Sequence, residues 1–250
     1  MARAQGRAML GRPELVALLL GLLLSLLMVL TGCSAPQGGS GADPSGDGSQ
    51  TTDGSAGPGE PTNDPDGTDQ LTIAVVGDSI TVGSDPTFAP GQVSEDSWVR
   101  YAVGDPVELA GGWARWGATT AEMAAAADPV PADVLVIMAG TNDLAAGTPT
   151  AQVARSLEQI VAEVGADEVL LCAVPPLDAR PDVVPPFNEF LQQTADAHGW
   201  AWTDPSAGIR TGGQFAPGMS ADGVHPTQAG ATDIGGQVRS VLLDRFATEQ

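Results

Sequence analysis

The chain has 250 residues, of which 31 are acidic and ten are basic, so its formal net charge is −21. A surface of this charge repels nucleic acid and anionic lipid headgroups, and we expect neither to bind it. Only about the last 180 residues have the composition of a folded domain, which is the usual size of one domain.

Residues 1–32 have the features of a signal peptide. Three arginines precede an apolar run, residues 15–30, which is shorter than the roughly 20 residues that a membrane-spanning helix needs. The following LTGC, residues 30–33, resembles a bacterial lipobox, in which the cysteine is acylated and the signal is cut away. We therefore expect Cys33 to anchor an extracytoplasmic protein to the bacterial cell membrane by lipid. An uncleaved helix is the alternative anchor, and it gives the same location.

Residues 33–69 are the expected linker. Gly, Ser, Pro, Thr and Asp dominate residues 34–69, which contain no aromatic residue and no Val, Ile or Leu to form a core. As a flexible coil this segment would span roughly 30 to 35 Å on average. The domain that follows, residues 70–250, can therefore work away from the bilayer.

From residue 71 onward, short apolar runs alternate with helix-like stretches, which predicts β-α-β units around a parallel sheet. The expected strands are residues 71–76, 107–110, 134–138, 168–174 and 201–203. The expected helices are residues 98–103, 120–127, 150–164, 186–198 and 227–248. The runs VLVIM and VLLCAV are apolar without alternation, as in strands that helices cover on both faces. We therefore expect an α/β fold: a three-layer α/β/α sandwich with a five-stranded parallel sheet.

Four polar fragments fall at the predicted carboxyl ends of strands or near the final helix, and ligands of open parallel sheets bind beyond such ends. They are GDS at 77–79, GGWARWGATT at 111–120, GTND at 140–143 and DGVHP at 222–226. Each alone is typical of a turn or a helix cap. Together they supply a serine, a glycine turn, an amide and a carboxylate–histidine pair, which is the set that acyl transfer requires.

The geometry of acyl transfer can be met by these fragments. A serine hydroxyl needs an imidazole to take its proton, and the imidazole needs a carboxylate; Asp222 and His225, three apart in a turn, could meet side by side. The oxyanion of the tetrahedral intermediate needs hydrogen-bond donors. The backbone N–H groups of Ser79 and Gly117 and the side chain of Asn142 could supply them, and the absent Cβ of glycine would allow close approach.

These fragments resemble the blocks of the SGNH, or GDSL-type, hydrolases, a family of serine esterases named for Ser, Gly, Asn and His. The matching residues, in the family's order, are Ser79 in VVGDSITVG, Gly117 in WARWGATT, Asn142 in AGTNDL, and His225 with Asp222 in DGVHP. The resemblance implies that Ser79 is the nucleophile, His225 the general base and Asp222 its orienter. It implies an oxyanion hole of Ser79, Gly117 and Asn142, a flavodoxin-like fold, and no metal or organic cofactor.

Other readings of individual residues are less favoured. The nucleophile elbow of α/β-hydrolases needs a glycine two positions after the serine, and Thr81 stands there. Asp78 and Asp143 are expected to bond nearby backbone groups and not to react. His198, the only other histidine, precedes Gly199 as in a helix C-terminal cap, so it is the weaker candidate for the base.

Two pairs of tryptophans, Trp113 with Trp116 and Trp200 with Trp202, could offer aromatic surface to a sugar. Packing in the core is the favoured role of these residues, because large aromatic side chains usually fill small α/β domains. Trp116 lies beside Gly117 and is therefore the first one to test for contact with substrate.

The expected function is that of a serine esterase that hydrolyses a carboxylic ester through an acyl-enzyme, with a short acyl group such as O-acetyl on a carbohydrate. One alternative is a non-catalytic lipoprotein that binds a cell-wall glycan. Others are a lysophospholipase, a thioesterase or a sugar O-acyltransferase that uses the same site. The expected partners are a small-molecule or glycan ester and, through the lipid anchor, the membrane, with the protein itself a monomer.

Overall fold

Residues 70–85 and 88–247 are the part of the chain that the computed structural model describes. The predicted signal peptide, the predicted lipid attachment site at Cys33 and the predicted linker lie outside the described residues. Within the described part, no helix is both long enough and apolar enough to cross a bilayer. All described residues belong to one of the two units into which the chain divides, Pro61–Gln250.

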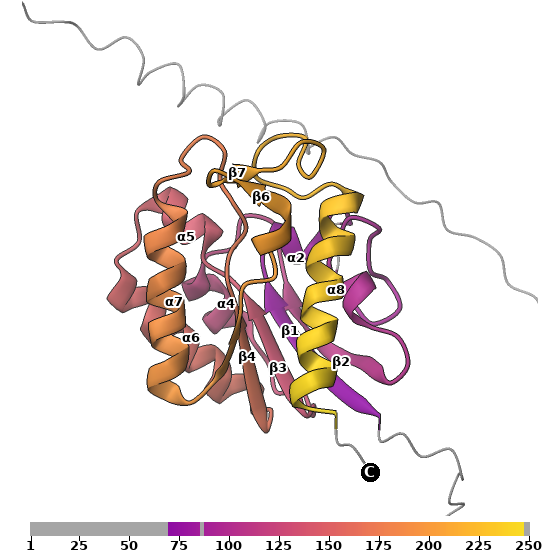
Figure 1. Ribbon diagram of the computed structural model, residues 1–250. Coiled ribbons are helices and arrows are strands. Elements are labelled where there is room, and N and C mark those ends of the chain that lie inside the picture. The colour runs from indigo at the N-terminus through magenta and orange to yellow at the C-terminus, as the bar shows by residue number, and fades with distance from the viewer. Residues whose placement is uncertain (1–69, 86–87, 248–250) are drawn as a thin grey trace, which may run out of the picture. The chain divides into compact units, whose positions relative to one another are not determined.

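Five parallel strands form the central sheet in the order β2-β1-β3-β4-β5 (Figure 1). The strands are β1 Leu71–Gly77, β2 Val107–Ala114, β3 Val134–Met138, β4 Glu168–Cys172 and β5 Ala201–Thr203. The predicted α/β class and five-stranded parallel sheet are therefore confirmed. The chain leaves β1 for β2 on one side and continues with β3 on the other, so the strand order reverses at β1. Ligands of open parallel sheets bind at such a reversal, beyond the carboxyl ends of the strands.

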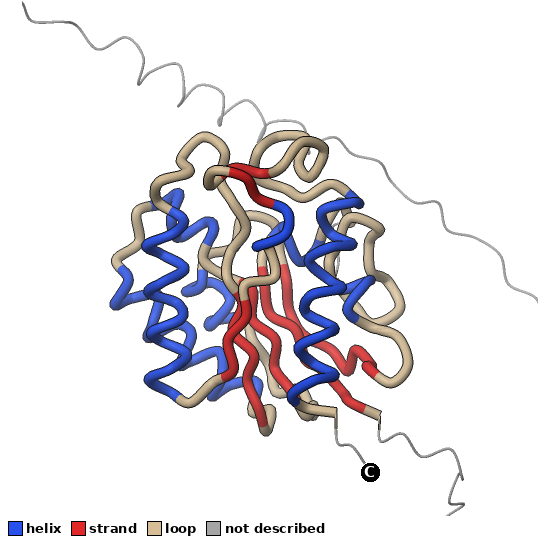
Figure 2. Tube along the Cα trace, viewed as in Figure 1, coloured by secondary structure: helices blue, strands red, loops and turns tan. Residues whose placement is uncertain are grey.

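Helices flank the sheet on both faces, as Figure 2 shows in blue beside the red strands. The helices are α2 Ser79–Val82, α3 Val99–Ala102, α4 Thr120–Ala126, α5 Thr141–Ala146, α6 Thr150–Val164, α7 Val184–His198 and α8 Gln228–Arg245. Val76 belongs to the buried cluster that includes Leu157 of α6, whereas Val75 belongs to the cluster that includes Val238 of α8. Successive residues of one strand thus face different helix layers. This confirms the three-layer sandwich and explains the apolar runs without alternation.

Strand β2 is longer than predicted, because it continues through Gly111 and Gly112 to Ala114. Gly112 has φ +140° and pairs with Val75 of β1, and a Cβ at Gly112 would lie 1.9 Å from the Val75 oxygen. Only glycine fits so close to β1, so the Gly-Gly pair continues this strand and does not end it. The prediction that the whole fragment 111–120 follows the strand was therefore wrong.

The other predicted bounds differ from the structure by a few residues at most. The bounds of β3, β5 and α6 agree with those predicted. Strand β4 ends at Cys172 instead of residue 174, and α7 begins at Val184 instead of residue 186. Two prolines occupy the first turn of α7, where a missing backbone N–H costs no helical hydrogen bond.

Several short elements were not predicted. They are α5, the 3-10 turn Ala207–Ile209 and an antiparallel hairpin of β6 Arg210–Thr211 with β7 Gln214–Phe215. Elements of two to six residues are too short to show a hydrophobic period in the sequence. One of them, α5, directly follows β3, as α2 directly follows β1, at the point where the strand order reverses.

Candidate active site

Ser79 is the first residue of α2 and lies directly beyond the carboxyl end of β1. Gly77 allows this sharp entry, because a Cβ there would lie 2.1 Å from Thr81 Oγ1. Asp78 caps the helix, with its Oδ1 accepting a hydrogen bond of 3.0 Å from the Ile80 N–H. As the first helical residue, Ser79 has a backbone N–H without an acceptor within the helix, so this group is available to an anion.

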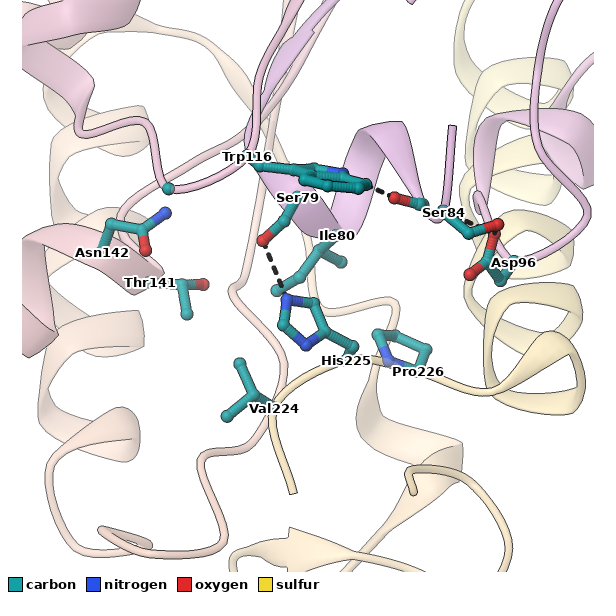
Figure 3. Close-up of a pocket in the computed structure, with 12 residues that line it drawn as sticks. Ser79, Ile80, Ser84, Asp96, Trp116, Thr141, Asn142, Val224, His225 and Pro226 are labelled. Carbon is teal, nitrogen blue, oxygen red and sulfur yellow. Dashed lines mark hydrogen bonds between the residues drawn. The ribbon is translucent and has the colours of Figure 1, made fainter. Parts of the chain in front are cut away.

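Ser79, His225 and Asp222 are linked by two consecutive hydrogen bonds. Ser79 Oγ is 3.0 Å from His225 Nε2, although 146 positions separate the two residues in the chain. His225 Nδ1 is 2.7 Å from Asp222 Oδ2. Figure 3 shows the contact between Ser79 and His225 as a dashed line. The structure therefore brings together the three residues named from the sequence, in the arrangement that carries a proton from a serine to an imidazole.

Asp222 is held as an anion. Partial burial acts to raise its pKa, but hydrogen bonds from the His225 side chain and from the N–H groups of His225 and Val224 outweigh this and hold the pKa well below its usual range. An ionised carboxylate at this position fixes the orientation of the imidazole ring and stabilises its protonated form. The turn itself thus supplies the donors that keep Asp222 charged.

Asn142 and Gly117 line the same pocket as Ser79. Asn142, in the first turn of α5, donates through Nδ2 to the Ala118 oxygen at 3.0 Å and to Asp78 Oδ2 at 3.3 Å. Gly117 has φ +72°, a conformation that favours glycine, but a Cβ there would meet nothing within 4 Å. No protein atom therefore requires a glycine here, and the expected close approach of its N–H to an oxyanion stays a prediction.

Two buried carboxylates support this part of the site. Asp143 accepts hydrogen bonds from the Thr120 N–H at 2.8 Å and from Thr120 Oγ1 at 3.0 Å, which ties α5 to the start of α4. Burial raises the pKa of Asp78 to about 7, helped by the nearby Asp143 and opposed by the Ile80 N–H and by His225. Both carboxylates bond backbone N–H groups, as predicted.

The pocket beside Ser79 has a volume of about 470 Å³, within the size range of small-molecule sites. Twelve residues line it: Ser79, Ile80, Gly83, Ser84, Asp96, Trp116, Gly117, Thr141, Asn142, Val224, His225 and Pro226. The sequence patterns named Ser79, Gly117, Asn142 and His225 and pointed to Trp116. Ser84 and Asp96 were missed, because they lie in irregular loops whose composition gives no signal.

The tryptophans have different surroundings. Trp113, Trp200 and Trp202 are partly buried and pack against one core cluster, which agrees with their favoured role. Trp116 is the only large apolar side chain of the described residues that is exposed, at 53%, and it lines the pocket. Trp116 is therefore not packed in the core, and a substrate in the pocket could contact it.

His198 lies at the end of α7 and outside the residues that line the pocket. Its ring stacks on Trp200, with the centroids 4.6 Å apart, and its Nε2 is 3.2 Å from Glu158 Oε1. The structure thus places His225, and not His198, beside Ser79.

Replacing Asn142 with alanine is expected to lower kcat for ester hydrolysis by about 10²- to 10³-fold, the usual cost of losing one oxyanion donor. The KM should change little, because the donor acts on charge that develops in the transition state. Steady-state kinetics measures both values, and thermal unfolding checks that the lost bonds to Ala118 and Asp78 leave the variant folded. A folded variant whose kcat is within about threefold of the wild type would exclude this role for Asn142.

Comparison with known proteins gives a family and a fold. Residues 75–232 match the model of the GDSL-like lipase/acylhydrolase family. Similar solved structures include a member of the lipolytic protein G-D-S-L family from Veillonella parvula, with 22% identity and a TM-score of 0.53 over 72% of this chain and 100% of that chain. A lipase/acylhydrolase from Enterococcus faecalis has 22% identity and a TM-score of 0.52 over 72% and 100% of the two chains. No curated protein matches.

Proposed function

Since the chain belongs to the GDSL-like lipase/acylhydrolase family and is a serine ester hydrolase, we propose that it removes a short acyl group, such as acetyl, from a carbohydrate or another small alcohol. The main observation in support of this proposal is the chain of hydrogen bonds from Ser79 through His225 to Asp222, which begins at the wall of the pocket. In this proposal Ser79 is the nucleophile, His225 the general base and Asp222 the residue that orients the imidazole.

In the first half of the reaction, His225 Nε2 takes the hydroxyl proton as Ser79 Oγ attacks the carbonyl carbon of the ester. The carbonyl oxygen becomes an oxyanion, which accepts hydrogen bonds from the N–H groups of Ser79 and Gly117. The longer of the two Asn142 contacts, 3.3 Å to Asp78, is the one that a small rotation would redirect to this oxyanion. His225 then gives its proton to the departing alcohol, and an acyl-serine remains.

In the second half, His225 takes a proton from water, which attacks the acyl carbon and releases the carboxylic acid. The His225 side chain is 48% exposed, so solvent can reach the imidazole once the alcohol has left. Ser79 recovers its proton from His225, and the site returns to its starting state. All proton transfers in this scheme use the same ring nitrogen, Nε2.

The preference for a short acyl group is supported by the size of the pocket. Its volume of about 470 Å³ must hold both the acyl part and the alcohol part of the ester. The pocket also contains the Asp96 carboxylate, and a long alkyl chain packed against a carboxylate would leave that charge poorly solvated. Both features favour a small acyl group over a fatty acyl chain.

A series of chromogenic esters with acetyl, butyryl and octanoyl groups tests this proposal on the purified protein. We expect the highest kcat/KM for the acetate ester and a decline with chain length. Fastest turnover of the octanoyl ester would contradict the short acyl group. No turnover of any ester above the buffer rate would contradict the proposed hydrolysis itself.

A further inference from the structure

The exposed Trp116 ring is held in a fixed position at the pocket. Its Nε1 donates a hydrogen bond of 2.7 Å to the Gly83 oxygen, so the ring is anchored although 53% of the residue is exposed. In Figure 3 the ring lies beside Ser79 and Ile80, over the pocket. A large aromatic side chain that is exposed and immobilised at a pocket is suited to pack against a ligand.

A partly buried carboxylate, Asp96, lies at the same pocket, next to Ser84. Its Oδ1 accepts hydrogen bonds from the Ser84 N–H at 2.9 Å, from Ser84 Oγ at 3.0 Å and from Ser94 Oγ. Burial acts to raise its pKa, but these hydrogen bonds outweigh it and hold the pKa below its usual range. Asp96 is therefore an ionised group that accepts hydrogen bonds and cannot donate them.

Gly83 positions both groups relative to the nucleophile. It follows the four-residue helix α2 that begins at Ser79, and its oxygen receives the Trp116 hydrogen bond. It has φ +70°, and a Cβ there would lie 2.5 Å from Asp96 Oδ1. The glycine thus admits the carboxylate on one side and anchors the indole on the other.

The segment that contains Asp96 is also held against α2, by two hydrogen bonds to Thr81. The hydroxyl of Ser97 donates to the Thr81 oxygen, and Trp98 Nε1 donates to Thr81 Oγ1 at 3.1 Å. Both Ser97 and Trp98 are fully buried. The distance between Asp96 and Ser79 is therefore set by packed structure and not by a free loop.

Figure 3 shows the two sides of the pocket. Asn142 and Thr141 lie on one side of Ser79, and Ser84 and Asp96 lie on the other, with Trp116 between them. The oxyanion donor Asn142 is thus well separated from the carboxylate. A carbonyl oxygen can be bound on the first side while another part of the ester extends towards the second.

We propose that Trp116 and Asp96, with Ser84, form an alcohol subsite that binds the alcohol part of the ester, and that this alcohol is a neutral sugar or a similar polyol. The proposal rests on the esterase function proposed above. The indole face packs against the C–H groups of the sugar ring, while Asp96 accepts hydrogen bonds from its hydroxyl groups. Ser84 Oγ, which donates its proton to Asp96, accepts a hydrogen bond from a neighbouring hydroxyl.

Other alcohols fit this subsite less well. An anionic alcohol is repelled by Asp96 and by the net charge of −21. A plain alkyl group would displace water from the carboxylate and supply no hydrogen bonds in place of those that the water made. A quaternary ammonium alcohol would gain from the indole face and the carboxylate, but such ligands are usually enclosed by several aromatic rings, and Trp116 is the one exposed large apolar side chain among the described residues.

The test compares three acetate esters: an acetylated methyl glycoside, cyclohexyl acetate as an apolar ring of similar size, and acetylcholine. We expect the wild type to prefer the glycoside. Asp96→Asn, which removes the charge and replaces one of the two acceptor oxygens by an NH2 donor at nearly the same shape, should lower the ratio of kcat/KM for glycoside over cyclohexyl ester by about 10- to 100-fold. Trp116→Ala should lower this ratio about tenfold, and Trp116→Phe should restore part of it.

Glu95→Gln is the matched control, because it removes the same charge from the neighbouring, exposed residue that does not line the pocket. It should leave the ratio unchanged. If the ratio of kcat/KM for the glycoside over the cyclohexyl ester is equal in the wild type, Asp96→Asn and Trp116→Ala, the proposed subsite is overturned. A preference for acetylcholine that Asp96→Asn removes would also overturn it, in favour of a cationic alcohol.

Ligand-observed NMR of the free methyl glycoside measures the subsite without turnover. We expect a binding signal with the wild type and with Glu95→Gln and its loss with Asp96→Asn. If the glycoside binds in this way but no ester is hydrolysed, the esterase function fails and the sugar site stands. If esters are hydrolysed but the signal is the same in all variants, the sugar site fails and the esterase function stands.

Discussion

Replacing Ser79 with alanine is expected to lower kcat/KM for a chromogenic acetate ester by about 10⁴-fold or more. The variant lacks the oxygen that forms the acyl bond, so no covalent intermediate can arise. It keeps the backbone N–H of residue 79 and the other oxyanion donors, so weak binding of the ester remains. The effect should therefore appear mainly in kcat, which initial-rate measurements over a range of ester concentrations separate from KM.

The matched control for this substitution is Ser240→Ala on α8, where the hydroxyl donates a long hydrogen bond of 3.4 Å to Asp244 Oδ2. It removes the same atom away from the pocket and should retain the activity of the wild type. Circular dichroism and thermal unfolding check that both variants are folded. Equal rates for Ser79→Ala and the wild type would reject Ser79 as the nucleophile and favour a protein that binds glycan without cleaving it.

Replacing His225 with alanine is expected to cause a loss of similar size, about 10⁴-fold in kcat. The substitution removes the imidazole nitrogen that lies 3.0 Å from Ser79 Oγ and takes its proton. The second histidine provides the comparison: His198→Ala should keep the rate within about twofold, because His198 contacts Glu158 and Trp200 and does not line the pocket. Loss of activity in His198→Ala alone would reverse the assignment.

The pH dependence of the wild type tests the same role. A histidine base accepts a proton only in its neutral form, so activity should fall at low pH. Asp222 does not cause this fall, because its hydrogen bonds hold its pKa well below the usual range and keep it charged. A flat profile of kcat/KM from pH 5 to pH 8, measured with a neutral ester, would contradict a histidine base.

The sequence predicted the fold well where burial alone determines the pattern. Strand β3 lies between two helix layers, so every residue of VLVIM is buried and the run has sharp ends. Strand β2 was predicted too short, because its continuation depends on the close approach of Gly112 to Val75. That contact joins residues far apart in the chain, and a local pattern of two glycines cannot distinguish it from a turn.

In the candidate site, too, local pairs of residues could be predicted from the sequence, whereas contacts between distant residues could not. Asp222 and His225 could be paired from the sequence because they lie three residues apart in one turn, and their hydrogen bond is local. Asp96 could not be found, because its position at the pocket depends on Ser84 and on the missing Cβ of Gly83. Trp116 was named as a candidate, but only its exposure and its place at the pocket in the structure distinguish it from a core residue.

The central claim is that Ser79 is made nucleophilic by His225. The most direct measurement is mass spectrometry of the protein after reaction with an organophosphonate that labels activated serines. We expect one adduct per chain, located on Ser79 by peptide mapping, absent from Ser79→Ala and formed far more slowly in His225→Ala. An adduct on another residue, or labelling of Ser79 at the same rate in His225→Ala, would contradict the account.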